Sequence, residues 1–345
     1  MALTKRGKVL IAILTAVLVL GTAVAVLALT GIGKHIPGLR NLTGGSAPER
    51  CLDGTVPKGG HVPDRPALAI KVENLPEARP QAGLDKADLV YEEQVEGGIT
   101  RFIVVFQCQN AKRLGPVRSA RLTDPPILLQ FGRDTLFGFA GAAGKVRKAV
   151  DASGVHDLSY DRPQSASAYE RDPNRSEPHN LYTSTGALYR AAHLKDHGPR
   201  QVFQFGDISS KAKRVSTIHL DFSPSADVFW HWSAQHKAWL RFHGTVPHTL
   251  EGGVQVSATN VVVMHVVMKD TGLVDAAGNP SPEAETVGKG KAFVFRDGKM
   301  IKGRWGRKSP EDVIQFVDRT GQSIDLQPGR TWVELVPTTV PVEVG

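Results

Sequence analysis

The stretch LVYEEQVEGGITRFIVVFQ, residues 89–107, contains two segments of strand composition, 89–95 and 100–107. β-Branched and aromatic residues are frequent in both segments, and such side chains suit the pleated, half-buried surface of a sheet. Residues 67–72 have a similar composition. These three segments predict that the first half of the chain is built around a β-sheet.

Segments of helical spacing follow these strands, at 119–133, 145–151 and 183–194. Pro125-Pro126 must begin or break the first of these helices, because proline lacks an amide hydrogen. Residues 135–140 are expected to form a short buried strand, and the polar residues 157–181 a long ordered loop. A loop of this length inside a compact domain is often functional. Residues 64–206 are therefore expected to form an α+β domain.

The second half of the chain alternates repeatedly between apolar and polar residues, as in IHLDFS at 218–223. Turns that contain Gly and Pro separate these segments. Asp297-Gly298 is a strong hairpin signal, because both residues tolerate the backbone of a tight two-residue turn. Residues 213–340 are therefore expected to be all β, with the boundary at 206–214. The predicted fold class is α+β, with a mixed α/β N-terminal domain and an all-β C-terminal domain behind one N-terminal transmembrane helix.

The uncharged segment VLIAILTAVLVLGTAVAVLALT occupies residues 9–30. As a helix it would measure about 33 Å, enough to cross a hydrocarbon core of roughly 30 Å. Lys and Arg residues precede it, so the positive-inside rule places residues 1–8 in the cytoplasm and the bulk of the chain outside the cell membrane. Ala23-Val24-Ala25 resembles a cleavage site but lies within the apolar run. We therefore expect an uncleaved single-pass signal-anchor rather than a cleaved signal peptide.

Much of the positive charge of the chain belongs to this anchor. The sequence has 42 Lys and Arg against 34 Asp and Glu, and residues 1–40 hold five of these cations and none of the anions. The remaining chain is nearly balanced, so the high pI gives little support to nucleic-acid binding. Residues 31–63, rich in Gly and Pro, are expected to be a linker or stem.

The two cysteines, Cys51 and Cys108, both lie on the predicted outer side. An oxidising compartment permits a disulfide between them, which would tie the stem to the folded domain. The alternative is that one thiol is buried and the other free. Cys51 lies well beyond the apolar run, so no lipid-attachment motif is present.

The motif GPVRSAR, which ends at Arg121, places two arginines three positions apart. On a helical turn Arg118 and Arg121 would point the same way and could bind a carboxylate or phosphate together. Glu93 and Arg101 lie on the neighbouring predicted strands. Of the adjacent residues Glu92 and Glu93, at most one faces any given cluster. These groups form either an ion-pair network or, if burial separates two carboxylate pKa values, an acid–base pair.

His179 and Asn180 stand at the end of the polar loop. His179 is a candidate general base, with Asp157 or Asp161 as the acid that orients it. Ser119 would complete a set resembling a catalytic triad if it lay close by. The GxSxG motif of a nucleophile elbow is absent, which counts against this hypothesis.

No cofactor or metal is predicted. The histidines of the second half lack the HExxH spacing of a metal site, and cysteines are unavailable as ligands. The GAAGK segment that ends at Lys145 suggests a phosphate-binding loop, but it lacks the first Gly and the Ser or Thr of a P-loop. A solvated basic helix face is the favoured interpretation of this segment.

Several motifs resemble the N-terminal domain of the YerB-like family of bacterial envelope proteins: RPQAGL (79–84), ADLVYEEQVEGGITRF (87–102), GPVRSAR (115–121) and EPHNLY (177–182). Two more are similar to its C-terminal domain: VGKGKAFVFRDGKMIKGRW (287–305) and PGRTWVELVP (328–337). The family is of unknown function, so the resemblance implies a location and an architecture but no reaction and no catalytic residues. This chain departs from the family in its apolar anchor without a lipid-attachment motif, and in Ala82 where Ser is expected.

Together these features predict a cell-envelope protein whose outer part binds an anionic or glycan ligand, such as a cell-wall polymer, or a protein partner. The expected site combines Glu93, Arg101, Arg118, Arg121, His179 and Asn180. One alternative is a cell-envelope hydrolase or transferase that uses Glu93 or His179 as a base. A second alternative is a structural scaffold, so whether the protein is an enzyme stays open.

Overall fold

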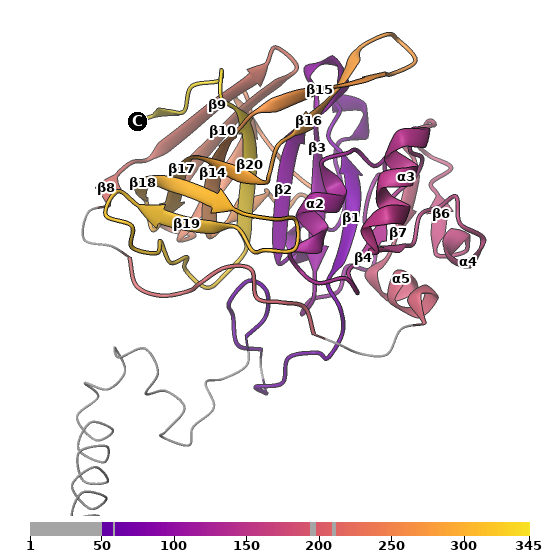
Figure 1. Cartoon of the computed structure of the whole chain (residues 1–345), viewed down its shortest axis with the longest axis horizontal. Helices are drawn as coiled ribbons and strands as arrows, with labels where there is room; N and C mark the ends of the chain where they lie inside the picture. The colour runs from indigo at the N-terminus through magenta and orange to yellow at the C-terminus, as the bar shows by residue number, and fades with distance from the viewer. Residues whose placement is uncertain (1–49, 58, 194–197, 209–211) are drawn as a thin grey trace, which may run out of the picture. The chain divides into compact units, whose positions relative to one another are not determined.

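The computed structural model of the chain describes residues 50–57, 59–193, 198–208 and 212–345, which belong to one compact unit, Arg50–Gly345 (Figure 1). The predicted transmembrane segment 9–30, the tail 1–8 and most of the predicted linker 31–63 lie outside the described residues. Within the described ranges, no helix is long and apolar enough to cross a membrane.

A mixed sheet forms the centre of this unit, with the strand order β19-β18-β17-β14-β20-β2-β3-β1-β4-β5 and with β8 paired to β18. Its strands are β1 (Leu68–Glu73), β2 (Leu89–Gln94), β3 (Thr100–Phe106), β4 (Leu136–Gly138), β5 (His156–Asp157), β8 (Lys213–Arg214), β14 (Asn260–Val266), β17 (Gly288–Arg296), β18 (Lys299–Arg307), β19 (Gln315–Asp318) and β20 (Thr331–Pro337). Near the C-terminus of the chain, β20 runs parallel to both β14 and β2. The sheet therefore continues across the predicted boundary at 206–214.

A second sheet packs on one face of the first, in the order β12-β11-β10-β9-β21 with β13 beside β11. Its strands are β9 (Thr217–Ser223), β10 (Ala226–Ser233), β11 (Ala238–His243), β12 (Val246–Pro247), β13 (Ser257–Ala258) and β21 (Glu343–Val344). Trp230 of this sheet and Trp332 of the central sheet are fully buried, with their ring centroids 5.3 Å apart. Aromatic burial of this kind holds the two sheets together.

The α-helices of the described residues are few and short: α2 (Asp124–Leu129), α3 (Gly144–Ser153), α4 (Pro163–Ala166) and α5 (Thr185–Ala192). Apolar residues of α2 and α3 join a core on the face of the central sheet that is opposite to the second sheet. In Figure 1 these two helices lie across β1 and its neighbouring strands. Two small antiparallel sheets of two strands complete the fold. One pairs β6 (Tyr169–Arg171) with β7 (Leu181–Thr183), and the other pairs β15 (Met268–Val274) with β16 (Pro280–Ala284).

The hairpin predicted at Asp297-Gly298 is confirmed. Arg296 pairs with Lys299, and the two residues between them have φ values of 53° and 64°. These are the positive values that the two central residues of a tight hairpin turn adopt.

The helix predicted over 119–133 is shorter than expected, because only Asp124–Leu129 is helical. Pro125 and Pro126 begin it, where their missing amide hydrogens cost nothing. The preceding residues are extended instead, and the amide of Arg118 donates to the carbonyl of Lys71 on β1. The loop predicted over 157–181 contains a short helix, α4, and the strand β6.

A disulfide joins Cys51 to Cys108, with their Cα atoms 5.7 Å apart. It links the first described residues to the segment that follows β3. Both cysteines of the sequence are used in this bond.

Candidate functional site

Three residues of one cross-strand row form the base of the candidate site. Arg101 on β3 lies opposite Glu73 on β1 and opposite Glu93 on β2. Residues directly opposite each other project from the same face of a sheet. This face is the one that α2 and α3 cover, because Ile103 of the same strand packs there with Ile127 of α2.

Glu93 does not meet an arginine. Its carboxylate contacts the amine of Lys71 on β1, and the same amine lies 2.7 Å from a carboxylate oxygen of Asp124 at the start of α2. All three side chains are fully buried. Burial raises the pKa of Asp124 to about 6, while the charge of Lys71 acts against this shift. Glu93 is thus part of a buried ion-pair network that fastens α2 to the sheet.

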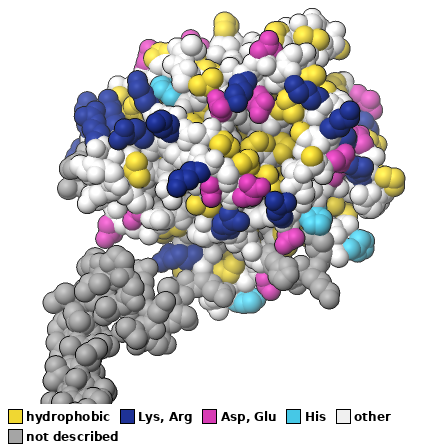
Figure 2. Space-filling view, in the orientation of Figure 1, with side chains coloured by type: hydrophobic (Ala, Val, Ile, Leu, Met, Phe, Trp, Pro, Cys, Tyr) yellow, Lys and Arg dark blue, Asp and Glu magenta, His cyan; other side chains and the backbone are white. Residues whose placement is uncertain are grey.

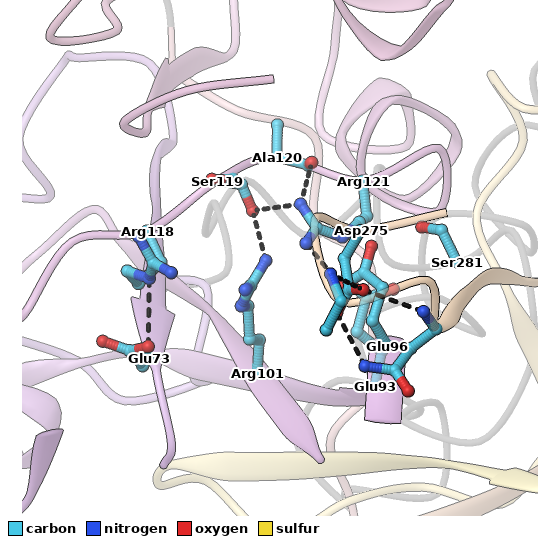
Figure 3. A network of polar contacts seen from close by, with 12 residues as sticks. Glu73, Glu93, Glu96, Arg101, Arg118, Ser119, Ala120, Arg121, Asp275 and Ser281 are labelled. Atoms are coloured by element: carbon cyan, nitrogen blue, oxygen red, sulfur yellow. Dashed lines mark hydrogen bonds and ion pairs between the residues drawn. The ribbon is translucent and has the colours of Figure 1, made fainter. Parts of the chain in front are cut away.

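Arg118 and Arg121 do not share a helical turn, so the predicted geometry for this pair is wrong. The extended backbone instead places them on either side of Arg101 (Figure 3). Nε of Arg118 donates to Glu73 at 3.0 Å, and Nη2 of Arg121 donates to Glu96 at 2.5 Å. Arg118 remains 23% exposed, and its two terminal nitrogens form no hydrogen bond with the described residues.

Arg101 differs from its two neighbours because it forms no ion pair with any described residue. Its Nη1 donates to the carbonyl of Ser119 at 3.2 Å, a carbonyl that also accepts from Arg121 at 3.3 Å. Its Nε is buried without a partner. Burial, followed by the charges of Arg121 and Arg118, lowers the pKa of Arg101 to about 10. The charges of Glu96 and Glu73 act against this shift and favour the charged guanidinium.

Most other arginines of the first half, unlike Arg101, have a carboxylate partner. On the face in Figure 2, Lys and Arg side chains often lie beside Asp and Glu side chains. Most arginines of the first half follow this pattern and form ion pairs at the surface, as Arg147 and Arg162 do with Asp157. Arg101 shares its lack of a carboxylate partner with Arg307 on β18, which is also buried and donates to backbone carbonyls.

His179 joins the cluster through a carboxylate that the sequence did not suggest. Its Nδ1 lies 2.9 Å from Oε2 of Glu73, whose other oxygen accepts from Arg118. The orienting acids expected from the sequence, Asp157 and Asp161, are wrong, because both pair with Arg147. Glu73 extends the predicted strand 67–72 by one residue, and its alternation with Lys71 is the signal that could have revealed it.

Asn180 lies outside the cluster. Its side-chain oxygen accepts from Arg171 at 2.7 Å, and its side-chain nitrogen donates to the carbonyl of Arg175 at 3.2 Å. These bonds shape the loop between β6 and β7. The structure therefore brings together Arg101, Arg118, Arg121 and His179. Glu93 lies opposite Arg101 but pairs with Lys71, whereas Asn180 bonds within its own loop.

The second half of the chain also contributes to this site. The β15–β16 hairpin places Asp275 and Ser281 beside Arg121 and Glu96 (Figure 3). Burial raises the pKa of Glu96, but the hydrogen bond and charge of Arg121, with a further hydrogen bond from Ser281, hold it below its usual value. The hairpin thus forms one wall of the cluster.

The opposite face of the sheet holds a separate polar group. Glu92 faces away from Glu93, as expected for adjacent strand residues. Its two oxygens accept from Arg241 of β11 at 2.8 and 2.7 Å, and both side chains are fully buried. Arg241 also contacts His248 at 2.9 Å. This ion pair joins the two sheets. Among the described residues, no group of three or more His, Cys, Asp or Glu side chains could hold a metal ion.

Comparison with known proteins agrees with this architecture. Residues 52–198 match the model of the "Protein of unknown function (DUF3048) N-terminal domain", and residues 218–333 match its C-terminal counterpart. This chain belongs to the DUF3048 family. The predicted YerB-like resemblance is thereby confirmed.

Two findings concern YerB itself. The DUF3048 chain is 30% identical over 285 residues to the "Putative lipoprotein YerB" of Bacillus subtilis (strain 168), covering 80% of this chain and 82% of that protein. The crystal structure of YerB superimposes with a TM-score of 0.72 at 26% identity, over 86% of this chain and 99% of that one. In this DUF3048 chain, Arg101, Arg118 and Arg121 come from the N-terminal family region and Ser281 from the C-terminal one.

Proposed function

We propose that this protein is a membrane-anchored, extracytoplasmic component of the cell envelope. The name of its relative YerB includes an envelope assignment, since lipoproteins are membrane-anchored. Here the apolar segment 9–30 would replace the lipid as a single-pass anchor. The disulfide favours this choice, because Cys51 and Cys108 have no free thiol to carry a lipid.

The outer part would bind an anionic group of an envelope ligand, such as a cell-wall polymer, a glycan or an acidic protein segment. The observation that carries this proposal is the buried guanidinium of Arg101, which has no carboxylate partner among the described residues. Arg118 offers its terminal nitrogens beside it, and Arg121 adds a third positive charge. Arginines bind carboxylates and phosphates in bidentate fashion, which makes both groups suitable ligands.

The test is binding of the full-length protein, in non-ionic detergent, to purified cell-wall fragments. Arg101→Gln removes the charge that lacks a partner, and we expect binding to weaken at least tenfold, as for the loss of one charge-assisted hydrogen bond of about 1.5–3 kcal/mol. Arg133→Gln is the matched control, because this arginine is 70% exposed and forms an ordinary surface ion pair. Equal binding by wild type and Arg101→Gln would exclude this site.

An enzymatic function is the second candidate, and the His179–Glu73 pair is the observation that favours it. A carboxylate that holds Nδ1 of a histidine is the arrangement that orients a general base. The side chain of His179 is 19% exposed, so its other nitrogen is within reach of a substrate. Release of soluble fragments from cell-wall material by wild type, but not by His179→Asn, would support a hydrolase. Binding without release by both proteins would support a binding protein.

A further inference from the structure

A second group of cations lies on the C-terminal half of the chain, far from Arg101 in sequence. Lys291 on β17, Lys302 and Arg304 on β18, and Arg319 after β19 line a depression of about 500 Å³. The ring of Phe293 forms part of its wall, and none of the residues that line this depression is acidic. Lys302 and Arg319 also line an adjoining depression of about 330 Å³. The two hollows form one groove, which we call the basic groove.

The strand register explains why these cations meet. Lys291 lies directly opposite Arg304, and Phe293 lies directly opposite Lys302. Gly303 lies opposite Asp318, so Arg319 continues the same register beside Lys302. Side chains at directly opposed positions share one face of the sheet. The register of three adjacent strand segments therefore sets the spacing of these four exposed cations.

The cations of the basic groove are not neutralised within the described part of the protein. None of the four forms an ion pair there, and Lys302 instead lies 5.9 Å from the ring centroid of Phe293. Asp318 lines the smaller hollow, where one of its oxygens accepts hydrogen bonds within its own turn. Like charges directly opposite one another destabilise a sheet, and Lys291 opposite Arg304 is such a pair. An external anion bound between these two cations would attract both of them and offset their mutual repulsion.

The spacing indicates what kind of anion fits. The pair Lys291–Arg304 and the neighbouring Lys302 are offset by two residues along the strands, which is about 7 Å. Charges repeated at this interval along a groove suit an anion that is itself repeated along a flexible chain. A single small anion would meet only part of the array.

A membrane surface fits the basic groove less well. Proteins that lie on bilayers combine cations with exposed apolar side chains that enter the lipid. The large exposed hydrophobic residues of the described chain lie elsewhere, at Val56, Val246, Val254, Val267, Val274 and Val344. Proteins that bind single-stranded nucleic acids commonly stack successive bases on several aromatic rings, and Phe293 is the one aromatic residue that lines this groove.

We propose that the basic groove binds a linear polymer of repeated phosphodiester groups without bases, such as a polyol phosphate chain. This site is independent of the arginine cluster around Arg101. Engagement of four cations makes the affinity strongly dependent on salt. With a slope of about −0.7 per cation, as for flexible single strands, log K falls by about 3 for each tenfold increase in salt.

The test titrates the full-length protein, in non-ionic detergent, with a synthetic glycerol phosphate oligomer. Lys291→Gln/Arg304→Gln should weaken binding at least tenfold and reduce the salt slope by about 1.4. Lys112→Gln/Lys148→Gln removes the same charge from the other half of the chain and should leave binding unchanged. The same loss should appear when Lys291→Gln/Arg304→Gln is introduced into an Arg101→Gln background, which separates this proposal from the one above.

Three results would overturn the proposal. The first is equal binding by wild type and Lys291→Gln/Arg304→Gln. The second is competition by mixed micelles of phosphatidylglycerol that exceeds competition by unlabelled oligomer, which would indicate a lipid site. The third is tighter binding of a single-stranded oligonucleotide of equal charge. A loss of folding cannot imitate the expected result, because removal of like-charge repulsion should preserve or raise the Tm of the double variant without ligand.

Discussion

Asp88, at the entry to β2, allows a quantitative test of the burial in this fold. Its side chain is fully buried, and one oxygen accepts from the backbone amides of Gln107 and Cys108 at 2.5 and 3.2 Å. The other oxygen has no partner among the described residues. Burial, followed by the charge of Asp53, raises the pKa of Asp88 from 3.8 to about 7, against the opposing effect of the two amides.

The sign of the effect follows from proton binding. Between pH 3.8 and 7 the folded protein holds a proton on Asp88 that the unfolded chain has lost. Stability is therefore highest below the unfolded pKa and falls by about 1.4 kcal/mol per pH unit as pH rises toward 7. Between pH 5 and pH 8 this residue alone should cost about 3 kcal/mol. An amide side chain does not titrate, so Asp88→Asn should remove that cost.

The assay is urea unfolding, followed by tryptophan fluorescence, of wild type and Asp88→Asn at pH 5 and pH 8. The difference between the two proteins should move by about 3 kcal/mol in favour of the variant at pH 8. Other titrating groups cancel in this double difference. Asp207→Asn, at an exposed aspartate, is the control and should show no such change. A difference that is the same at both pH values would refute the argument that burial governs Asp88.

Three further experiments test other parts of the fold. Lys71→Met should lower the free energy of unfolding at pH 7 by about 3–5 kcal/mol, because it leaves two buried carboxylates without an ion-pair partner. A loss below about 1 kcal/mol, measured by urea unfolding, would contradict the buried network. Cys51→Ser/Cys108→Ser should cost up to about 4 kcal/mol, given a sequence separation of 57, and equal stability of wild type with and without reductant would disprove it. Gly298→Ala should lower the Tm more than Gly278→Ala does. Both glycines have positive φ, but only a Cβ on Gly298 would meet an indole ring, that of Trp232, at 2.7 Å. Equal losses of Tm would show that the ring moves away freely.

Local sequence patterns determined most of the secondary structure. The strand segments 67–72, 89–95 and 100–107 became β1, β2 and β3, because β-branched and aromatic residues suit a sheet wherever it is buried. Asp297-Gly298 specified its hairpin because tolerance of positive φ is a property of these residue types. The 119–133 helix was overestimated, since residues 118–120 bond to β1 and to the segment after β4, a contact that no local pattern reports.

Tertiary structure alone decided which charges meet. His179 pairs with Glu73, which is 106 residues earlier in the chain, and Arg241 pairs with Glu92 across 149 residues. The sequence could propose that Arg101, Arg118 and Arg121 act together, but not that Arg101 would be the one without a carboxylate. Pairings of this kind depend on strand register and on the late return of β20 between β2 and β14. Composition fixes what each segment can form, whereas long-range packing selects the partner of each side chain.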